Sequence, residues 1–275
     1  MRADLHMHTT DSDGRLSHEE LFQEAKQKGV NIISITDHDI CKNVDQNYAL
    51  AQKYQIKYLP GIELSTLYKG KNVHVLGYFR GDGYKAEEML EYYNYIKEGR
   101  KQRAKQFVRN LEYYYHLKIT YQDLLDVSNG IIARPHIAKA IIKSYPQYTH
   151  NEVFERFIGD HAKAYVPSTE LSLKEGLSLL KKHGALTVLA HPKLLKPSIH
   201  DEVLSYDFDG IEAIYGLNHK QDTERYLKIA KEKDWLVTAG SDYHGIPNDK
   251  SHKELGFVTL EAEHLKRFLH AIKKT

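Results

Sequence analysis

The chain has 275 residues, of which 41% are hydrophobic, and a formal net charge of +2 at pH 7. This length fits one α/β barrel, or a smaller domain that carries an insertion. The charge is too close to zero for a general nucleic-acid coat, so any preference for anions must come from local charge. The single cysteine, Cys41, excludes a disulfide framework and a thiolate zinc site, and it indicates a reducing compartment.

The sequence gives no sign of a membrane-bound protein. The first residues lack the apolar core of a signal peptide, and no stretch approaches the ~20 apolar residues of a membrane span. We therefore expect a soluble, cytoplasmic protein, and no obligate protein partner is evident.

Short β-rich apolar runs alternate with amphipathic helical segments through most of the chain. The expected strands cover residues 3–8, 31–36, 57–62, 73–78, 186–190, 210–214 and 236–240, and the helices between them include residues 17–28, 44–54, 173–183 and 219–233. Ser17 and Glu20 have the spacing of a capping box, and Gly29 and Gly184 fall at helix C-terminal stops. Repeated βα units indicate a parallel sheet, either a barrel or an open doubly wound sheet.

Residues 81–170 break this alternation. They have a mainly helical pattern with tyrosine clusters at residues 92–95 and 113–115, and no convincing strand ladder. Between residues 97 and 145 there are ten Lys and Arg against four Asp and Glu, so the rest of the chain has a net charge of about −4. We expect a barrel domain of residues 1–80 and 171–275, capped at its mouth by a helical insertion of residues 81–170. A solvated helix face is the alternative interpretation of the basic run.

Histidine and carboxylate side chains gather where the expected strands end. They lie in Asp4-Leu5-His6-Met7-His8, Thr36-Asp37-His38-Asp39, Gly61-Ile62-Glu63, Ala190-His191-Pro192 and Ser241-Asp242-Tyr243-His244, with Asp13 in a turn and His74 inside a strand. A closed barrel brings its strand ends to one mouth, whereas an open sheet spreads them along an edge, so the pattern favours a barrel of about seven strands. Imidazole and carboxylate are the usual ligands of Zn²⁺, Mn²⁺ and Fe²⁺. The joint pattern predicts a multinuclear metal site.

A single histidine is weak support for a metal site, because a histidine is more often a surface residue or a hydrogen-bonded core residue. The chain has 17 histidines, and several lie in helical or loop contexts without a partner motif. We expect these to be incidental: His18, His116, His150, His252 and His270.

Together the motifs resemble the PHP (polymerase and histidinol phosphatase) family of metal-dependent phosphoesterases. The matching segments run from Asp4-Leu5-His6-Met7-His8 through Val73-His74-Val75-Leu76-Gly77-Tyr78 to Gly240-Ser241-Asp242-Tyr243-His244. The resemblance implies an α/β fold, a distorted (β/α)7 TIM-like barrel, with a trinuclear centre of Mn²⁺, or alternatively Fe²⁺ or Zn²⁺. The implied ligands are His6, His8, Glu63 and Asp242 for the first metal, Glu63, His74 and His191 for the second, and Asp13, His38 and His244 for the third.

We expect hydrolysis by in-line attack of a metal-bound hydroxide on phosphorus. His191 or His244 would help to protonate the leaving oxygen, and three carboxylates would orient ligating imidazoles: Asp4, Asp37 and Asp39. No serine or cysteine lies in a nucleophile motif, so a covalent phosphoenzyme is not expected.

A motif in the insertion indicates the class of substrate. The segment Ile132-Ala133-Arg134-Pro135-His136-Ile137-Ala138 is similar to an Arg-Pro-His element of PHP proteins that act on nucleotides. Those relatives remove the 3′-phosphate from nucleoside 3′,5′-bisphosphates, and some trim short RNA or DNA from the 5′ end. Arg134 suits a bidentate grip on a phosphate, and His136 can add a hydrogen bond. Arg100 and Arg103, at i and i+3 on one expected helix, could hold a second phosphate. A structural salt bridge for Arg134 and a solvated face for Arg100 and Arg103 are the alternatives.

The sequence thus predicts a phosphoesterase that acts on the 3′-phosphate of nucleoside 3′,5′-bisphosphates, and also trims short RNA or DNA from 5′ to 3′. A histidinol-phosphatase-like or other small-molecule phosphatase is the alternative within the same fold. An amidohydrolase-like barrel and a non-catalytic metal-binding PHP module are the alternatives from other classes. The arginines of the insertion argue against the first of these, and the filled ligand positions argue against the second.

Overall fold

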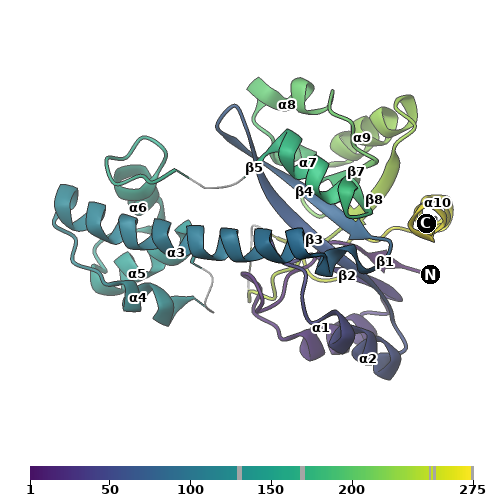
Figure 1. Cartoon of the computed structure of the whole chain (residues 1–275), viewed down its shortest axis with the longest axis horizontal. Helices are drawn as coiled ribbons and strands as arrows, with labels where there is room; N and C mark the ends of the chain where they lie inside the picture. The colour runs from purple at the N-terminus through teal and green to yellow at the C-terminus, as the bar shows by residue number, and fades with distance from the viewer. Residues whose placement is uncertain (129–131, 168–170, 248, 250–251, 274–275) are drawn as a thin grey trace. The chain divides into compact units, whose positions relative to one another are not determined.

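The chain folds into two compact units, which Figure 1 shows with their helices and strands labelled. The computed structural model describes residues 1–128, 132–167, 171–247, 249 and 252–273. The first unit, here the barrel unit, comprises Met1–Leu90 and Glu170–Thr275, and the second, here the helical unit, comprises Glu91–Thr169.

The barrel unit is built on one sheet. Its strands are β1 (Ala3–Asp4), β2 (Ile32–Ile35), β3 (Lys57–Tyr68), β4 (Lys71–Phe79), β5 (Leu171–Ser172), β6 (Ala185–Leu189), β7 (Gly210–Tyr215) and β8 (Leu236–Gly240). The order is β1-β2-β3-β4-β6-β7-β8, with β5 paired to β3. The amide of Leu5 donates to the carbonyl of Ala239 at 3.0 Å, so the two ends of this path meet and the sheet is nearly closed. The expected barrel-like α/β fold is confirmed.

β4 departs from the expected parallel arrangement. It pairs antiparallel with both β3 and β6, whereas β1–β2, β2–β3, β6–β7 and β7–β8 are parallel. β3 and β4 are joined by the turn Lys69-Gly70, whose φ angles of 48° and 70° suit a tight hairpin. Parallel pairing needs a crossover of a dozen or more residues. The two-residue turn cannot supply one, so the expectation of a parallel sheet was wrong for β4.

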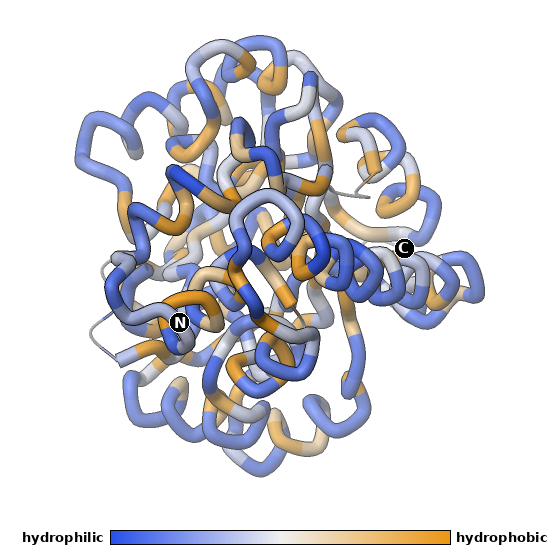
Figure 2. Tube along the Cα trace, turned by 90° about the vertical axis from the view of Figure 1, so that its left-hand side faces the viewer, coloured by the Kyte–Doolittle hydropathy of each residue, from blue (hydrophilic) through white to orange (hydrophobic). Residues whose placement is uncertain are grey.

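Amphipathic helices cover this sheet. They are α1 (His18–Gln27), α2 (Val44–Tyr54), α7 (Leu173–Lys182), α8 (Pro197–Val203), α9 (Lys220–Glu232) and α10 (Ala262–Lys273), with short helices η1 (Asp82–Lys85) and η3 (Pro192–Leu194). The expected capping box is confirmed, because Ser17 and Glu20 bond reciprocally at the start of α1. Figure 2 shows hydrophilic and hydrophobic stretches alternating along the helices, as expected for helices with one buried face.

The helical unit has a hydrophobic core of its own. It contains most of α3 (Glu87–Tyr115), followed by α4 (Tyr121–Val127), α5 (Arg134–Ser144), α6 (His150–Val153) and η2 (Phe154–Ile158). Phe107, Leu111 and Ile141 are completely buried in this core. Among the described residues of both units, no helix combines the length and apolarity that crossing a membrane requires.

Candidate metal centre

Two buried histidines lie just beyond β1, held beside the segment that follows β8. The amide of Asp242 donates to the carbonyl of His6 at 3.0 Å, and the amide of His8 donates to the carbonyl of Tyr243 at 2.9 Å. His6 and His8 are two residues apart in extended chain, so their side chains point the same way. Glu63 Oε2 lies 3.2 Å from Nε2 of each, and Asp242 Oδ1 lies 3.1 Å from His8 Nε2. The structure therefore brings together His6, His8, Glu63 and Asp242.

Glu63 is the hub of the centre. Its second oxygen, Oε1, accepts from His74 Nδ1 at 2.8 Å and from His191 Nε2 at 2.9 Å. His74 reaches it through the antiparallel hairpin, in which His74 on β4 pairs with Ser65, two residues beyond Glu63 on the same face. His38 lies beside Glu63 because residues 37–39 bond to the β3 backbone, and its Nδ1 is 3.3 Å from Glu63 Oε2.

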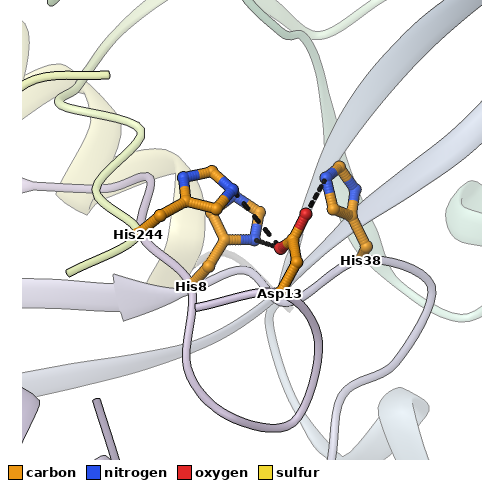
Figure 3. A group of neighbouring side chains, drawn as sticks. All are labelled: His8, Asp13, His38 and His244. Carbon is orange, nitrogen blue, oxygen red and sulfur yellow. Dashed lines mark ion pairs between the residues drawn. The ribbon is translucent and has the colours of Figure 1, made fainter. Parts of the chain in front are cut away.

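A third group surrounds Asp13 (Figure 3). Asp13 Oδ1 lies 3.3 Å from His244 Nε2 and 3.6 Å from His8 Nδ1, while Asp13 Oδ2 lies 3.7 Å from His38 Nε2. The loop that carries Asp13 turns back tightly at Gly14, where an added Cβ would lie 2.4 Å from the carbonyl oxygen of His8. Only glycine allows this close approach. All nine side chains expected as ligands therefore lie in one connected cluster.

Unpartnered buried atoms show that this cluster suits metal ions. His6 Nε2, His38 Nδ1 and Glu63 Oε2 are buried and have no hydrogen-bond partner among the described residues. They nevertheless face one another, since Glu63 Oε2 lies 3.2 Å from His6 Nε2 and 3.3 Å from His38 Nδ1. Buried polar atoms are almost always satisfied in proteins. A divalent cation would satisfy all three atoms, and imidazole and carboxylate suit Mn²⁺, Fe²⁺ and Zn²⁺.

The cluster also sets the charge of its members. Burial tends to raise the pKa of Glu63, but the facing imidazoles outweigh it and hold this pKa well below its usual range. The pKa of Asp242 is likewise well below its usual range, because His6 and His8 outweigh burial. Burial lowers the pKa of His38 to about 3, which the nearby carboxylates offset only in part. Burial tends to lower the pKa of His6 and of His8 as well, but the facing carboxylates outweigh it and raise both above the usual range, so a metal ion would displace their protons.

Three residues that the sequence motifs did not select complete the surroundings. Glu212 of β7 accepts from His6 Nδ1 at 2.9 Å, and the Tyr215 hydroxyl donates to Asp242 Oδ2 at 3.0 Å. His252, expected to be incidental, stacks on the ring of His244 with centroids 4.0 Å apart. A carboxylate inside the apolar run at residues 210–215 was the one available signal, because a buried charge requires partners.

His18 was also expected to be incidental, but it lies in a buried polar network. Its Nε2 is 2.9 Å from Asp11 Oδ2, and its Nδ1 is 2.7 Å from Asn47 Oδ1. This network ties the start of α1 to α2 and to the loop that carries Asp13.

The three carboxylates expected to orient imidazoles bond to the segments that carry the ligands. Their bonds run to backbone amides and hydroxyls and join Asp4 to Ser241 and Gly256, Asp37 to Thr9 and Ser12, and Asp39 to Ser65. The Asp4–Ser241 bond of 2.6 Å links the end of β1 to the residue after β8, and so joins the segments that carry His6 and Asp242. These carboxylates therefore hold the loops of the centre in place.

Arg134 and His136 lie at the start of α5 in the helical unit. Arg134 Nη1 donates to Asp160 Oδ1 at 2.6 Å, and the guanidinium lies 5.8 Å from the Tyr165 ring centroid. The salt bridge considered for Arg134 is thus present. His136 Nδ1 accepts from the amide of Ala133 at 3.1 Å and so caps the helix.

Arg100 and Arg103 lie one turn apart on α3. Arg103 Nε donates to the carbonyl of Val166 at 2.9 Å, and its guanidinium lies 5.5 Å from the Phe107 ring centroid. Arg103 therefore contributes to the packing of the helical unit.

A nearly closed α/β barrel with histidines and carboxylates clustered beyond its strands defines a metal-dependent hydrolase. The PHP domain profile matches residues 4–246, and the chain belongs to the PHP family. The expectation of a metal-dependent phosphoesterase of this family is confirmed.

Curated relatives and solved structures agree with this assignment. A 5′-3′ exoribonuclease of Haemophilus influenzae is 26% identical over 249 residues, which are 88% of this chain and 89% of that protein. A 3′,5′-nucleoside bisphosphate phosphatase of Chromobacterium violaceum is 25% identical over 248 residues, which are 88% of this chain and 86% of that protein. A structure from Bifidobacterium adolescentis, described as a metal-dependent phosphoesterase, is 27% identical with a TM-score of 0.80 and covers 98% of this chain and 96% of its own.

A second structure, described as an amidohydrolase from Chromobacterium violaceum, has the same TM-score of 0.80 at 23% identity. It covers 99% of this chain and 97% of its own. This likeness supports the fold.

Proposed function

We propose that this protein hydrolyses a phosphate monoester of a nucleotide, with the 3′-phosphate of nucleoside 3′,5′-bisphosphates as its main target. The convergence of buried histidines and carboxylates on Glu63, in a chain of the PHP family, is the observation that carries the proposal. The relative named as a 3′,5′-nucleoside bisphosphate phosphatase, similar over 88% of this chain, supports the choice of substrate.

The centre is proposed to hold three divalent ions, with Mn²⁺ preferred and Fe²⁺ or Zn²⁺ as alternatives. Glu63 lies in two of the ligand groups, so two of the ions would share it. Bound there, they would activate a water molecule for attack on phosphorus and stabilise charge on the phosphoryl oxygens. The ligands are assigned as His6, His8, Glu63 and Asp242; Glu63, His74 and His191; and Asp13, His38 and His244.

The residues around the centre are proposed to orient the metal ligands and to protonate the leaving oxygen. Asp242 is held by the Tyr215 hydroxyl at 3.0 Å. Of the two imidazoles proposed to protonate the leaving oxygen, His191 contacts Glu63 at 2.9 Å and His244 contacts Asp13 at 3.3 Å. Either imidazole can give this proton only where its Nε2 does not bind a metal ion, because His244 Nδ1 is already bonded to the carbonyl of Asp242 at 2.8 Å.

The helical unit is proposed to bind the second phosphate of the substrate. The planar guanidinium of Arg134 matches two phosphate oxygens, and His136 would add a hydrogen bond. Asp160 now occupies Arg134 Nη1 at 2.6 Å, and the phosphate would take its place. Asp160 is 54% exposed, so releasing it into water costs little. Arg100 and Arg103, both on α3, are proposed as supporting cations.

A second candidate function is 5′-to-3′ trimming of short RNA or DNA. It is favoured by the 26% identity to an exoribonuclease over 88% of this chain. Both functions need hydrolysis of a phosphoric ester and recognition of a nearby phosphate, so one centre suits both.

The test is a substrate panel for the purified, Mn²⁺-loaded protein: adenosine 3′,5′-bisphosphate, histidinol phosphate and a 5′-phosphorylated oligonucleotide. We expect the highest kcat/KM for the bisphosphate, measured as released phosphate for the two small phosphomonoesters and as released mononucleotide for the oligonucleotide. Absence of hydrolysis of all three would contradict the proposal. A preference for the oligonucleotide would support the second candidate, and a preference for histidinol phosphate would exclude both nucleotide functions.

A further inference from the structure

Glu212 is a buried carboxylate that belongs to none of the three proposed metal groups. It lies within β7 and is 0% exposed. Its two oxygens contact two different ligand-bearing segments. Oε1 lies 2.9 Å from His6 Nδ1, and Oε2 accepts from the backbone amide of His191 at 2.8 Å. One side chain therefore touches a ligand of the first proposed metal and a ligand of the second.

The contact with Oε1 determines that Nδ1 of His6 carries a proton. A carboxylate is only an acceptor, so Nδ1 of His6 must carry the hydrogen. Nε2 is therefore the nitrogen left to bind a metal ion, and it lies 3.2 Å from Glu63 Oε2 and 3.4 Å from Asp242 Oδ1. In metal-binding histidines, a carboxylate bonded to the ring nitrogen that does not bind the metal fixes the orientation and the tautomer of the ring.

The second contact holds a strained backbone. His191 has φ 25° and ψ 62°, in the left-handed region that non-glycine residues avoid. Such a conformation persists only where the surroundings enforce it. The bond from the His191 amide to Glu212 supplies part of that constraint, and the ring of His191 then reaches Glu63 Oε1 at 2.9 Å.

The neighbouring strand is adapted to this carboxylate. A Cβ added to Gly240 of β8 would lie 2.4 Å from Glu212 Oε1 and 2.2 Å from the Cβ of His6. Gly240 therefore leaves the space in which Glu212 meets His6. A buried carboxylate costs free energy that an apolar strand residue would not. Its two oriented contacts indicate that Glu212 serves the candidate metal centre and not the stability of the sheet.

We propose that Glu212 is a positioning residue that couples the first and second metal positions. It does so by fixing the tautomer of His6 and the backbone of His191 with one carboxylate. The inference rests on the proposed function, because it requires a centre that binds metal ions. It implies that loss of Glu212 weakens two positions together, while the position of Asp13, His38 and His244 is retained.

The experiment is a direct Mn²⁺ titration of metal-free protein, with bound metal measured by elemental analysis. Wild type is expected to bind three ions. Glu212→Gln keeps the shape but replaces one acceptor oxygen with an N–H donor, so we expect about 10- to 100-fold weaker binding of two ions and unchanged binding of the third. Glu212→Asp keeps both oxygens and should recover part of the affinity. The control, Glu224→Gln on α9, changes a carboxylate that is 62% exposed and should match wild type.

A second readout is the proton chemical shift of the His6 Nδ1–H in Zn²⁺-loaded protein. This N–H should have the downfield shift of a bond to a carboxylate in wild type and lose it in Glu212→Gln, a change that a purely structural role would not produce. Unchanged affinities, an unchanged His6 shift, or equal weakening of all three ions would overturn the inference. If Glu212→Gln does not fold, the same comparison with Glu212→Asp decides. A wild type that binds no metal overturns the proposed function instead.

Discussion

The barrel unit and the helical unit hold their candidate functional groups in opposite ways. In the barrel unit, the side chains of His6, His8 and Glu63 are at most 1% exposed and face one another. In the helical unit, Arg134 is 26% exposed and its partner Asp160 is 54% exposed. Buried charges must keep their partners, whereas exposed ion pairs contribute about 0–1 kcal/mol and exchange partners readily. Loss of one buried partner should therefore abolish metal binding, whereas loss of a partly exposed group of the helical unit should weaken phosphate binding and leave metal binding unchanged.

Glu63→Gln should have the largest effect, because it removes a charge that several imidazoles share. We expect the protein to lose bound metal and phosphate release to fall to background, as measured by elemental analysis and a phosphate assay. Circular dichroism checks that the variant folds. Full metal content in a folded Glu63→Gln protein would contradict the shared-hub description of the centre. Glu224→Gln is the matched control.

Removing metal should destabilise the barrel unit. When the free concentration of an ion is about 1,000 times its Kd, binding stabilises the folded state by about 4 kcal/mol. We therefore expect a chelator to lower the Tm of wild type by several degrees, measured by calorimetry. The Glu63→Gln variant should show no such shift, and an equal shift in both proteins would mean that the metal binds elsewhere.

Phe107→Ala tests the helical unit separately. Phe107 is 0% exposed in the core of this unit, and such a truncation costs about 3–5 kcal/mol. We expect a lower free energy of unfolding in urea, with metal content at the wild-type level at low temperature. Loss of metal from the folded variant would show that the two units depend on each other, and would break the comparison.

Arg134→Ala should raise KM for adenosine 3′,5′-bisphosphate about 10- to 100-fold, because a charge-assisted hydrogen bond contributes about 1.5–3 kcal/mol. Metal content should not change. Arg134→Lys keeps the charge but not the bidentate fork, so its KM should lie between that of wild type and that of Arg134→Ala. If metal is lost together with activity, Arg134 has a structural role and not a role in phosphate binding.

Gly70→Ala should have the smallest effect. An alanine Cβ there would meet nothing within 4 Å, so the cost comes from the backbone φ of 70° alone, about 1 kcal/mol. The variant should be less stable in urea denaturation but retain activity. Gly81→Ala is the control, because its Cβ is equally unhindered and its φ of −157° is open to any residue. Lost activity in folded Gly70→Ala would show that the hairpin positions His74 more delicately than its contacts indicate.

Local patterns determined much of this protein. The helix expected at residues 44–54 and the strand expected at residues 236–240 have the bounds of α2 and β8. The capping box of α1 was readable because capping depends on neighbours three residues apart. The motifs that follow the strands also identified the family, since their residues and spacing extend over the whole chain.

Tertiary structure decided what depends on distant segments. The antiparallel course of β4 follows from a tight turn and brings His74 to Glu63, which no local periodicity could indicate. Glu212 resembled an isolated polar residue in an apolar run until the fold placed it between His6 and His191. His252 had no partner motif because its partner, His244, stacks on it only in the folded chain. A sequence specifies ligands through their own spacing, but the groups that orient them meet only when the sheet closes.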